Sequence, residues 1–163
     1  MNRTLNKRLD KAKTILRNAG NLACSQQGLL IARQCAGYGK LGYNTRTMPP
    51  QDLTATLQDY SGLLKDCLSD MAGSVISEDS WSLAQLGFQE GGVGLRDPVM
   101  HAQGAYVASF SAAGTLAKRI WPAFDGADTA GWSRAWETTD ALNAKLQPAA
   151  QVALGGDVLR QKK

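Results

Sequence analysis

An apolar stripe at helical spacing is the feature that most constrains how this chain can fold. Within residues 51–71 the apolar side chains recur every three or four positions; they are Leu53, Leu57, Tyr60, Leu64, Cys67, Leu68 and Met71. An α-helix turns once every 3.6 residues, so this spacing places all of them on one helix face. Pro49 and Pro50 precede the stripe and break the chain there. We therefore expect a core helix over residues 51–71.

The rest of the chain also has the pattern of helices. No segment alternates apolar and polar residues strictly enough over five positions to predict a strand. The sequence therefore predicts an all-α fold, a helical bundle of about five to seven helices with a glycine-rich turn between two helical groups. The further helices are expected over residues 5–19, 25–36, 78–86, 98–113, 115–121 and 129–146.

The glycine-rich turn has three glycines, Gly91, Gly92 and Gly94, which permit a sharp turn and close backbone approach. A nucleotide-binding loop is not favoured, because an acid takes the place of the third glycine of a dinucleotide motif and no Gly-Lys-Ser/Thr follows. Asp97 and Pro98 instead predict the cap and first residue of a helix. We expect Arg96 to pair with a carboxylate inside the protein, the alternative being a contact with a phosphate.

Basic charge is concentrated at one end of the chain. Residues 1–46 carry a net charge of +8, and the remaining residues carry −4. Such an asymmetry is typical of a surface that lies along nucleic-acid phosphates, although a solvated helix face would look the same. We divide the chain into a basic helical bundle (1–72), a second helical segment (73–147) and a flexible or truncated tail (148–163).

The candidate nucleic-acid contacts come from two stretches of this basic end. The first helix carries cations away from its apolar stripe, and a Gly/Tyr-rich segment follows the second helix. Tyrosine can stack on bases while nearby cations neutralise phosphates, although tyrosines packed under a loop are the alternative. The candidate residues are Arg3, Lys7, Lys11, Arg17, Lys40, Tyr43 and Arg46.

No pattern in the sequence predicts a metal, a cofactor or a catalytic centre. The cysteines Cys24, Cys35 and Cys67 lack zinc spacing, and we expect them to be small core residues in a reducing compartment. Asp66 and Asp70 fit a solvated acidic face better than a metal site, and His101 has no nucleophile or acid in any recognisable motif. No apolar run approaches the roughly 20 residues of a membrane span. We expect an intracellular protein, in the nucleus or the cytoplasm.

Several motifs together resemble the region just downstream of the palm in non-LTR (LINE-type) retrotransposon reverse transcriptases. The most specific is Gly91-Gly92-Val93-Gly94-Leu95-Arg96 with Ala105-Tyr106-x-Ala108-Ser109 after it, and the second is Arg46-Thr47-Met48-Pro49-Pro50. Leu29-Leu30 through Arg33-x-Cys35, Gly42-Tyr43 and Trp81-x-x-Ala84-x-Leu86 belong to the same resemblance. It covers approximately residues 5–115, and we see no matching motif beyond that region.

The resemblance implies a helical thumb and the connection behind it, which grip the template–primer duplex mainly through its backbone. Gly87 stands where the family tends to have a proline, and Val93 replaces a leucine. The family's catalytic Tyr/Phe-x-Asp-Asp element is absent, since no Asp-Asp dipeptide occurs in this chain. We therefore expect a piece or remnant of a retrotransposon RNA-directed DNA polymerase that is inactive on its own and binds RNA–DNA or DNA duplexes. The other pieces of the parent polymerase, its palm and fingers, are further possible partners.

Two alternatives remain open from the sequence. The first is a helical protein–protein interaction module whose basic end is only solvated surface. The second, less favoured, is an independent enzyme that uses His101 or the Asp66/Asp70 pair.

Overall fold

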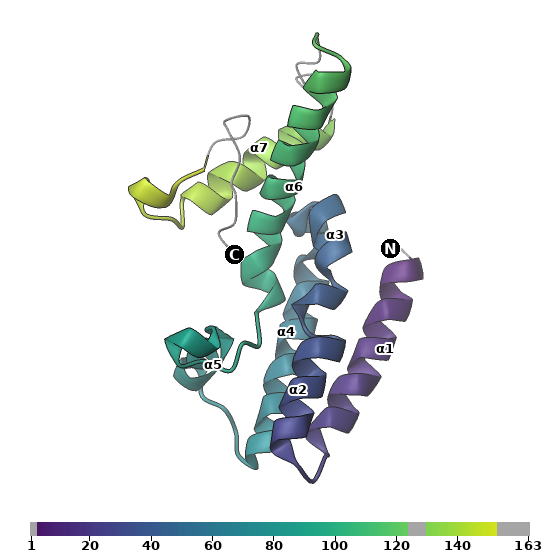
Figure 1. The fold of residues 1–163 in the computed structure, drawn as a ribbon, viewed down its shortest axis with the longest axis vertical. Coiled ribbons are helices and arrows are strands. Elements are labelled where there is room, and N and C mark those ends of the chain that lie inside the picture. The colour runs from purple at the N-terminus through teal and green to yellow at the C-terminus, as the bar shows by residue number, and fades with distance from the viewer. Residues whose placement is uncertain (1–2, 124–129, 153–163) are drawn as a thin grey trace. The chain divides into compact units, whose positions relative to one another are not determined.

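The fold is all-α, as the sequence predicts (Figure 1). The computed structural model describes residues 3–123 and 130–152, and no strand occurs in these ranges. The predicted turn at 124–128 and the tail from residue 153 onward lie outside them. The α-helices are α1 (Arg3–Gly20), α2 (Ser25–Ala36), α3 (Gly42–Thr47), α4 (Pro50–Ala72), α5 (Glu78–Gln85), α6 (Pro98–Ile120) and α7 (Ala130–Asn143), with short 3₁₀ turns η1 (Tyr38–Lys40), η2 (Phe88–Glu90) and η3 (Pro148–Ala150).

Most helices lie where their periodicity places them, and two differ from expectation. The short helix α3 begins at the end of the Gly/Tyr-rich segment (residues 37–43) and continues to Thr47, where no helix was predicted. The expected helices 98–113 and 115–121 are instead one helix, α6, which passes through Gly114 without a break. Gly114 leaves room for the ring of Trp132, because a Cβ atom at this position would lie 2.5 Å from Cη2 of Trp132. The glycine thus lets α7 approach α6 closely.

The chain forms two compact units. The first consists of residues 1–43 and 54–99, and the second of residues 44–53 and 100–163. This division does not follow the predicted segments 1–72, 73–147 and 148–163. The early part of the predicted segment 73–147 belongs to the first unit, where Lys65 on α4 forms a 2.5 Å ion pair with Glu78 on α5. The start of α4 belongs instead with α6 and α7.

The first unit is built on α1, α2 and α4, which lie side by side (Figure 1). The apolar stripe of α1 is buried, and its members are Leu5, Leu9, Ala12, Leu16 and Ala19. From α4, Tyr60 is completely buried and its hydroxyl donates a hydrogen bond to the carbonyl of Ala36 on α2. The Cys67 thiol donates to the carbonyl of Leu16 on α1 at 3.2 Å. Two polar contacts from one helix therefore fix both of its neighbours.

The glycine-rich turn folds back onto α5. The carbonyl of Ala84 accepts hydrogen bonds from the backbone N–H groups of Val93 and Leu95, at 3.2 and 3.3 Å. Gly91 and Gly94 have φ angles of +84° and +70°, which favour glycine. Gly92 is needed for space instead, because a Cβ atom there would lie 2.2 Å from the carbonyl oxygen of Leu86. The three glycines therefore serve a tight structural turn in two different ways.

The turn ends in a capped helix, as the sequence predicts. Oδ1 of Asp97 accepts a hydrogen bond from the backbone N–H of Val99 at 3.1 Å, and α6 begins at Pro98. An aspartate in this position satisfies one of the free donors of the first turn, and proline has no donor to lose there. The turn therefore starts α6 and leads out of the first unit.

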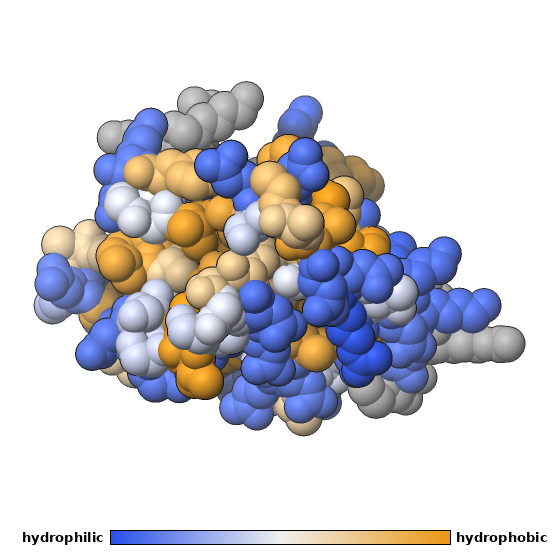
Figure 2. Space-filling model, turned by 90° about the horizontal axis from the view of Figure 1, so that it is seen from below, coloured by the Kyte–Doolittle hydropathy of each residue, from blue (hydrophilic) through white to orange (hydrophobic). Residues whose placement is uncertain are grey.

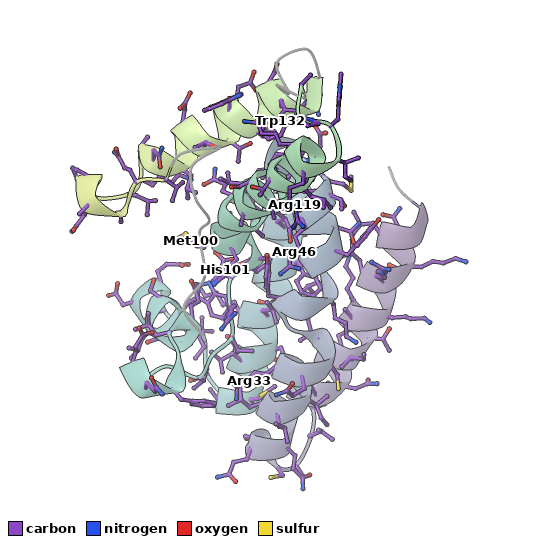
Figure 3. All side chains as sticks on the ribbon, turned by 45° about the horizontal axis from the view of Figure 1, so that its top comes forward. Arg33, Arg46, Met100, His101, Arg119 and Trp132 are labelled. Carbon is purple, nitrogen blue, oxygen red and sulfur yellow. The ribbon has the colours of Figure 1, made fainter. Side chains whose placement is uncertain are left out.

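The second unit has a small aromatic core between α6 and α7. Tyr106, Val107 and Ala135 are buried, and the Phe110 ring packs against both Tyr106 and Trp132, with ring centroids 4.6 and 5.7 Å apart. Trp132 projects from α7 toward α6 (Figure 3). The start of α4 joins this unit through an ion pair, in which Nη1 of Arg134 lies 2.7 Å from Oδ2 of Asp52.

Candidate nucleic-acid interface

A basic groove runs along α1 in the first unit. It has a volume of about 440 Å³. One wall comes from α1 and the other from the end of α2, from η1 and from the start of α3. The residues that line this basic groove are Arg8, Lys11, Ala12, Ile15, Cys35, Gly39, Lys40 and Tyr43. Three of the predicted contact residues, Lys11, Lys40 and Tyr43, are therefore brought together by the fold.

The spacing on α1 explains why these side chains share one wall. Arg8, Lys11 and Ile15 follow one another at intervals of three and four residues, so they lie on the same helix face. The buried stripe of α1 lies beside this face. Ala12 belongs to both, because it is buried and also lines the groove. Packing of α1 against α2 thus fixes which cations point into the groove.

Arg8 and Tyr43 meet across the groove. The guanidinium carbon of Arg8 lies 5.6 Å from the centroid of the Tyr43 ring, within the range of a cation–π contact. Tyr43 nevertheless remains 66% exposed. The predicted alternative, a tyrosine packed under a loop, does not describe it. An exposed ring held by an arginine is available for stacking on a base.

Three cationic side chains line the groove. Arg8, Lys11 and Lys40 are all exposed, and no carboxylate lines the groove. Cations that line the same groove repel one another, and an anionic ligand bound between them would relieve that repulsion. The arrangement suits the binding of phosphates.

The other predicted contact residues are not among those that line the groove. Lys7 is exposed one turn before Lys11 and extends the same face of α1. Arg17 is also exposed, but six residues from Lys11 correspond to about 120° around the helix, so it lies on another face. Arg46 is exposed on α3 and belongs to the second compact unit (Figure 3). Arg3 begins α1, and its side chain lies outside the described part of the structure.

Arg8 was missing from the predicted contact residues. It was counted in the basic charge of residues 1–46 but was not distinguished from the other cations of α1. The available signal was its spacing of three residues from Lys11, which places both on one face. Its contact with Tyr43 could not be read from the sequence, because it depends on how α1 is rotated against α2.

Among the described residues, the structure does not show the internal ion pair that the sequence predicted for Arg96. Arg96 is exposed, and within residues 3–123 and 130–152 it has no hydrogen bond and no carboxylate partner. The reason is that the glycine turn is already held by backbone hydrogen bonds to Ala84 and Leu86, so no side chain is needed to fix it. Arg96 lines a separate pocket together with Arg33.

The prediction that all three cysteines are core residues holds for one of them. Cys67 is buried, and burial raises the pKa of its thiol to about 11, with the Asp70 carboxylate adding to the effect. Cys24 and Cys35 are exposed instead of being core residues. Cys24 precedes the first turn of α2, and Cys35 lines the basic groove, so neither belongs to the apolar face of its helix.

The other candidates for chemistry are dispersed. Asp66 and Asp70 are exposed on α4, and His101 is exposed on the first turn of α6 (Figure 3). Across the residues that the structure describes, no three His, Cys, Asp or Glu side chains gather as metal ligands would. In the same part of the chain no helix combines the length and apolar character needed to cross a membrane.

Comparison of the chain with protein-family models, curated proteins and solved structures finds no match.

Proposed function

We propose that this chain is a helical module of a retrotransposon reverse transcriptase that grips the backbone of nucleic-acid duplexes and is not catalytic on its own. The observation that carries the proposal is the basic groove, which Arg8, Lys11 and Lys40 line together with an exposed tyrosine and which has no carboxylate from the described residues in its lining. The origin in a reverse transcriptase rests on the motif resemblance described above. The expected ligand is an RNA–DNA or DNA duplex.

The groove suits recognition of phosphates irrespective of sequence. Lysine and arginine neutralise phosphates and release counter-ions, which gives affinity without reading bases. Tyr43 would add a stacking surface at a strand end or an unpaired base, since every base has a π face. Both features agree with a role in holding a duplex whose sequence varies.

The test is a fluorescence-anisotropy titration of the chain against a short RNA–DNA hybrid at several salt concentrations. Three phosphate contacts predict a slope of about −2.7 in a plot of log affinity against log salt, or a loss of roughly 40-fold between 50 and 200 mM salt. Lys11→Ala and Lys40→Ala should each reduce the magnitude of that slope by about 0.9. An affinity that does not change with salt would exclude binding driven by phosphates.

Arg17→Ala provides a matched control. It removes an exposed cation from another face of the same helix, so it changes the net charge of the protein by the same amount as Lys11→Ala. We expect the slope of Arg17→Ala to match that of the unmodified protein. An equal loss in Arg17→Ala and Lys11→Ala would mean that overall charge, and not the groove, attracts the duplex.

A second candidate function is a protein–protein interaction module. It is favoured by exposed apolar side chains on and beside α5, where Val75, Leu83, Leu86 and Phe88 are 93%, 53%, 41% and 59% exposed. Figure 2 shows apolar side chains on the left and in the centre of one face, among hydrophilic ones, and mainly hydrophilic side chains on the right. Under this alternative the hybrid would not bind even at low salt, and charge reversal at Lys7, Lys11 and Arg17 would leave binding of the protein partner unchanged.

A further inference from the structure

Arg33 on α2 is a cation that has no anionic partner among the described residues. Its Nε atom is buried and has no hydrogen-bond acceptor, and in the part of the chain that the structure describes no carboxylate forms an ion pair with its guanidinium. Arginine stays protonated in proteins, so the charge cannot be removed by loss of a proton. A partly buried, unpaired guanidinium is unfavourable and strengthens the attraction for any anion that reaches it.

The fold holds this guanidinium in place. Its carbon lies 4.1 Å from the centroid of the Phe88 ring, a close cation–π contact. The turn approaches from another direction, because a Cβ atom on Gly94 would lie 3.2 Å from both Nε and Nη2 of Arg33. Figure 3 shows Arg33 on α2 in this unit. The group is therefore positioned in advance, which reduces the entropy lost on ligand binding.

A pocket of about 330 Å³ opens beside Arg33, within the first unit. Its second cation is Arg96, which is exposed and has no carboxylate partner among the described residues. Gln34 and Tyr38 supply further polar groups, and no acid contributes to the lining. A site of this size admits a phosphate group with part of the molecule that carries it. Two arginines suit the tetrahedral oxygens of phosphate, because each guanidinium presents several donors in a fixed plane.

We propose that the pocket formed by α2, η1 and the glycine turn, here named the Arg33/Arg96 pocket, binds a phosphate group. Arg33 contacts the phosphate through the N–H groups that its burial leaves accessible, and Arg96 closes the pocket from the turn. The phosphate comes either from the end of a nucleic-acid strand or from an internal phosphodiester. The pocket shares only Gly39 with the basic groove, so this proposal does not depend on the proposed function.

The experiment is a titration of the ¹⁵N-labelled chain with inorganic phosphate, followed by the backbone amide signals of residues 37–39 and 94–96. We expect these signals to shift and saturate in the unmodified protein. Arg33→Met and Arg96→Ala should each weaken phosphate affinity at least about tenfold, since each removes a charged hydrogen bond. Shifts that do not saturate, or an affinity that both variants leave unchanged, would refute the proposal.

A control variant keeps the result interpretable. Arg119→Ala removes an exposed arginine from α6 and should leave phosphate affinity within about twofold. If Arg33→Met unfolds the protein, Arg96→Ala still decides the question, because Arg96 is exposed and forms no ion pair with a residue that the structure describes. Failure of the proposed function would be seen in the hybrid titration and not here.

The source of the phosphate is distinguished with two short oligonucleotides that differ only in a 5′ phosphate. Tighter binding of the phosphorylated strand, lost in Arg96→Ala, assigns the pocket to strand ends. Equal binding of both strands, also lost in Arg96→Ala, assigns it to internal phosphodiesters. Equal binding that Arg96→Ala does not change would contradict a nucleic-acid ligand for this pocket.

Discussion

The Tyr60 hydroxyl on α4 donates a buried hydrogen bond to the backbone carbonyl of Ala36, at the last residue of α2. Carbonyls at a helix end have no partner within the helix and need one from elsewhere. Tyr60 supplies it from the core of the first unit. The same residue therefore fills the core with its ring and completes α2 with its hydroxyl.

Tyr60→Phe should lower the free energy of unfolding by about 1–3 kcal/mol, because it leaves a buried acceptor unsatisfied while it keeps the ring. Urea denaturation followed by circular dichroism measures this change. Tyr43→Phe is the control, since Tyr43 is exposed and its substitution should change stability by no more than about 0.5 kcal/mol. Equal stabilities of the two variants would show that the contact with Ala36 contributes nothing.

Alkaline pH should destabilise the first unit. Burial raises the pKa of the Cys67 thiol from 9.0 to about 11, and burial likewise raises the pKa of the Tyr60 hydroxyl. Between pH 9 and 11 the unfolded chain has released the thiol proton while the folded chain retains it. The unfolded state therefore binds fewer protons, and stability falls as pH rises.

Denaturation curves at pH 8, 9, 10 and 11 test this expectation. Cys67→Ala should be less stable at pH 8 but should show a shallower fall between pH 9 and 10. Cys24→Ala, which removes an exposed thiol, should retain the steep fall. If Cys67→Ala falls as steeply as the unmodified protein, another group is responsible for the loss.

Substitution of two glycines of α6 by alanine should change the stability of the protein in opposite directions. Gly104→Ala places its methyl group in open space and should stabilise the protein by about 0.5–1 kcal/mol, since alanine favours the helix. Gly114→Ala would drive a methyl group into Trp132 and should destabilise by about 1–3 kcal/mol. Thermal unfolding of both variants measures the difference. The contact between α6 and α7 would be disproved by a stabilised Gly114→Ala variant.

Substitution of the neighbouring residues Arg96 and Asp97, just before α6, should have different effects on stability. Arg96→Ala should change the free energy of unfolding by no more than about 0.5 kcal/mol, because Arg96 is exposed and makes no ion pair with any residue that the structure describes. Asp97→Ala removes the helix cap and should destabilise by about 1 kcal/mol. A larger loss in Arg96→Ala than in Asp97→Ala would restore the pairing expected from the sequence.

Local patterns predicted the helices well, because each depends on its own period and caps. The stripe of α4 is an example: Leu53, Leu57, Tyr60 and Leu64 are all buried as the spacing requires. The continuation of α6 through Gly114 could not be predicted from the local sequence. It resembles a helix break in the sequence, and only the Trp132 ring on another helix explains why α6 continues through it.

The candidate sites were predicted less completely than the helices, for a physical reason. Charge counts identified the basic end but could not separate Lys11 from Arg17, which differ only in their direction around α1. Arg96 was assigned to an internal pair because the backbone contacts that already hold the turn, such as Gly94 with Leu86, do not appear in sequence. Interactions between elements, and not within them, decide both sites.

The basic groove is built on two successive helices, since a connection of residues 21–24 joins α1 to α2. Closing so short a loop loses little chain entropy, and contacts between near neighbours in sequence favour rapid folding. The groove thus depends on a helical hairpin that can assemble early. It should regain its form quickly whenever the chain unfolds and refolds.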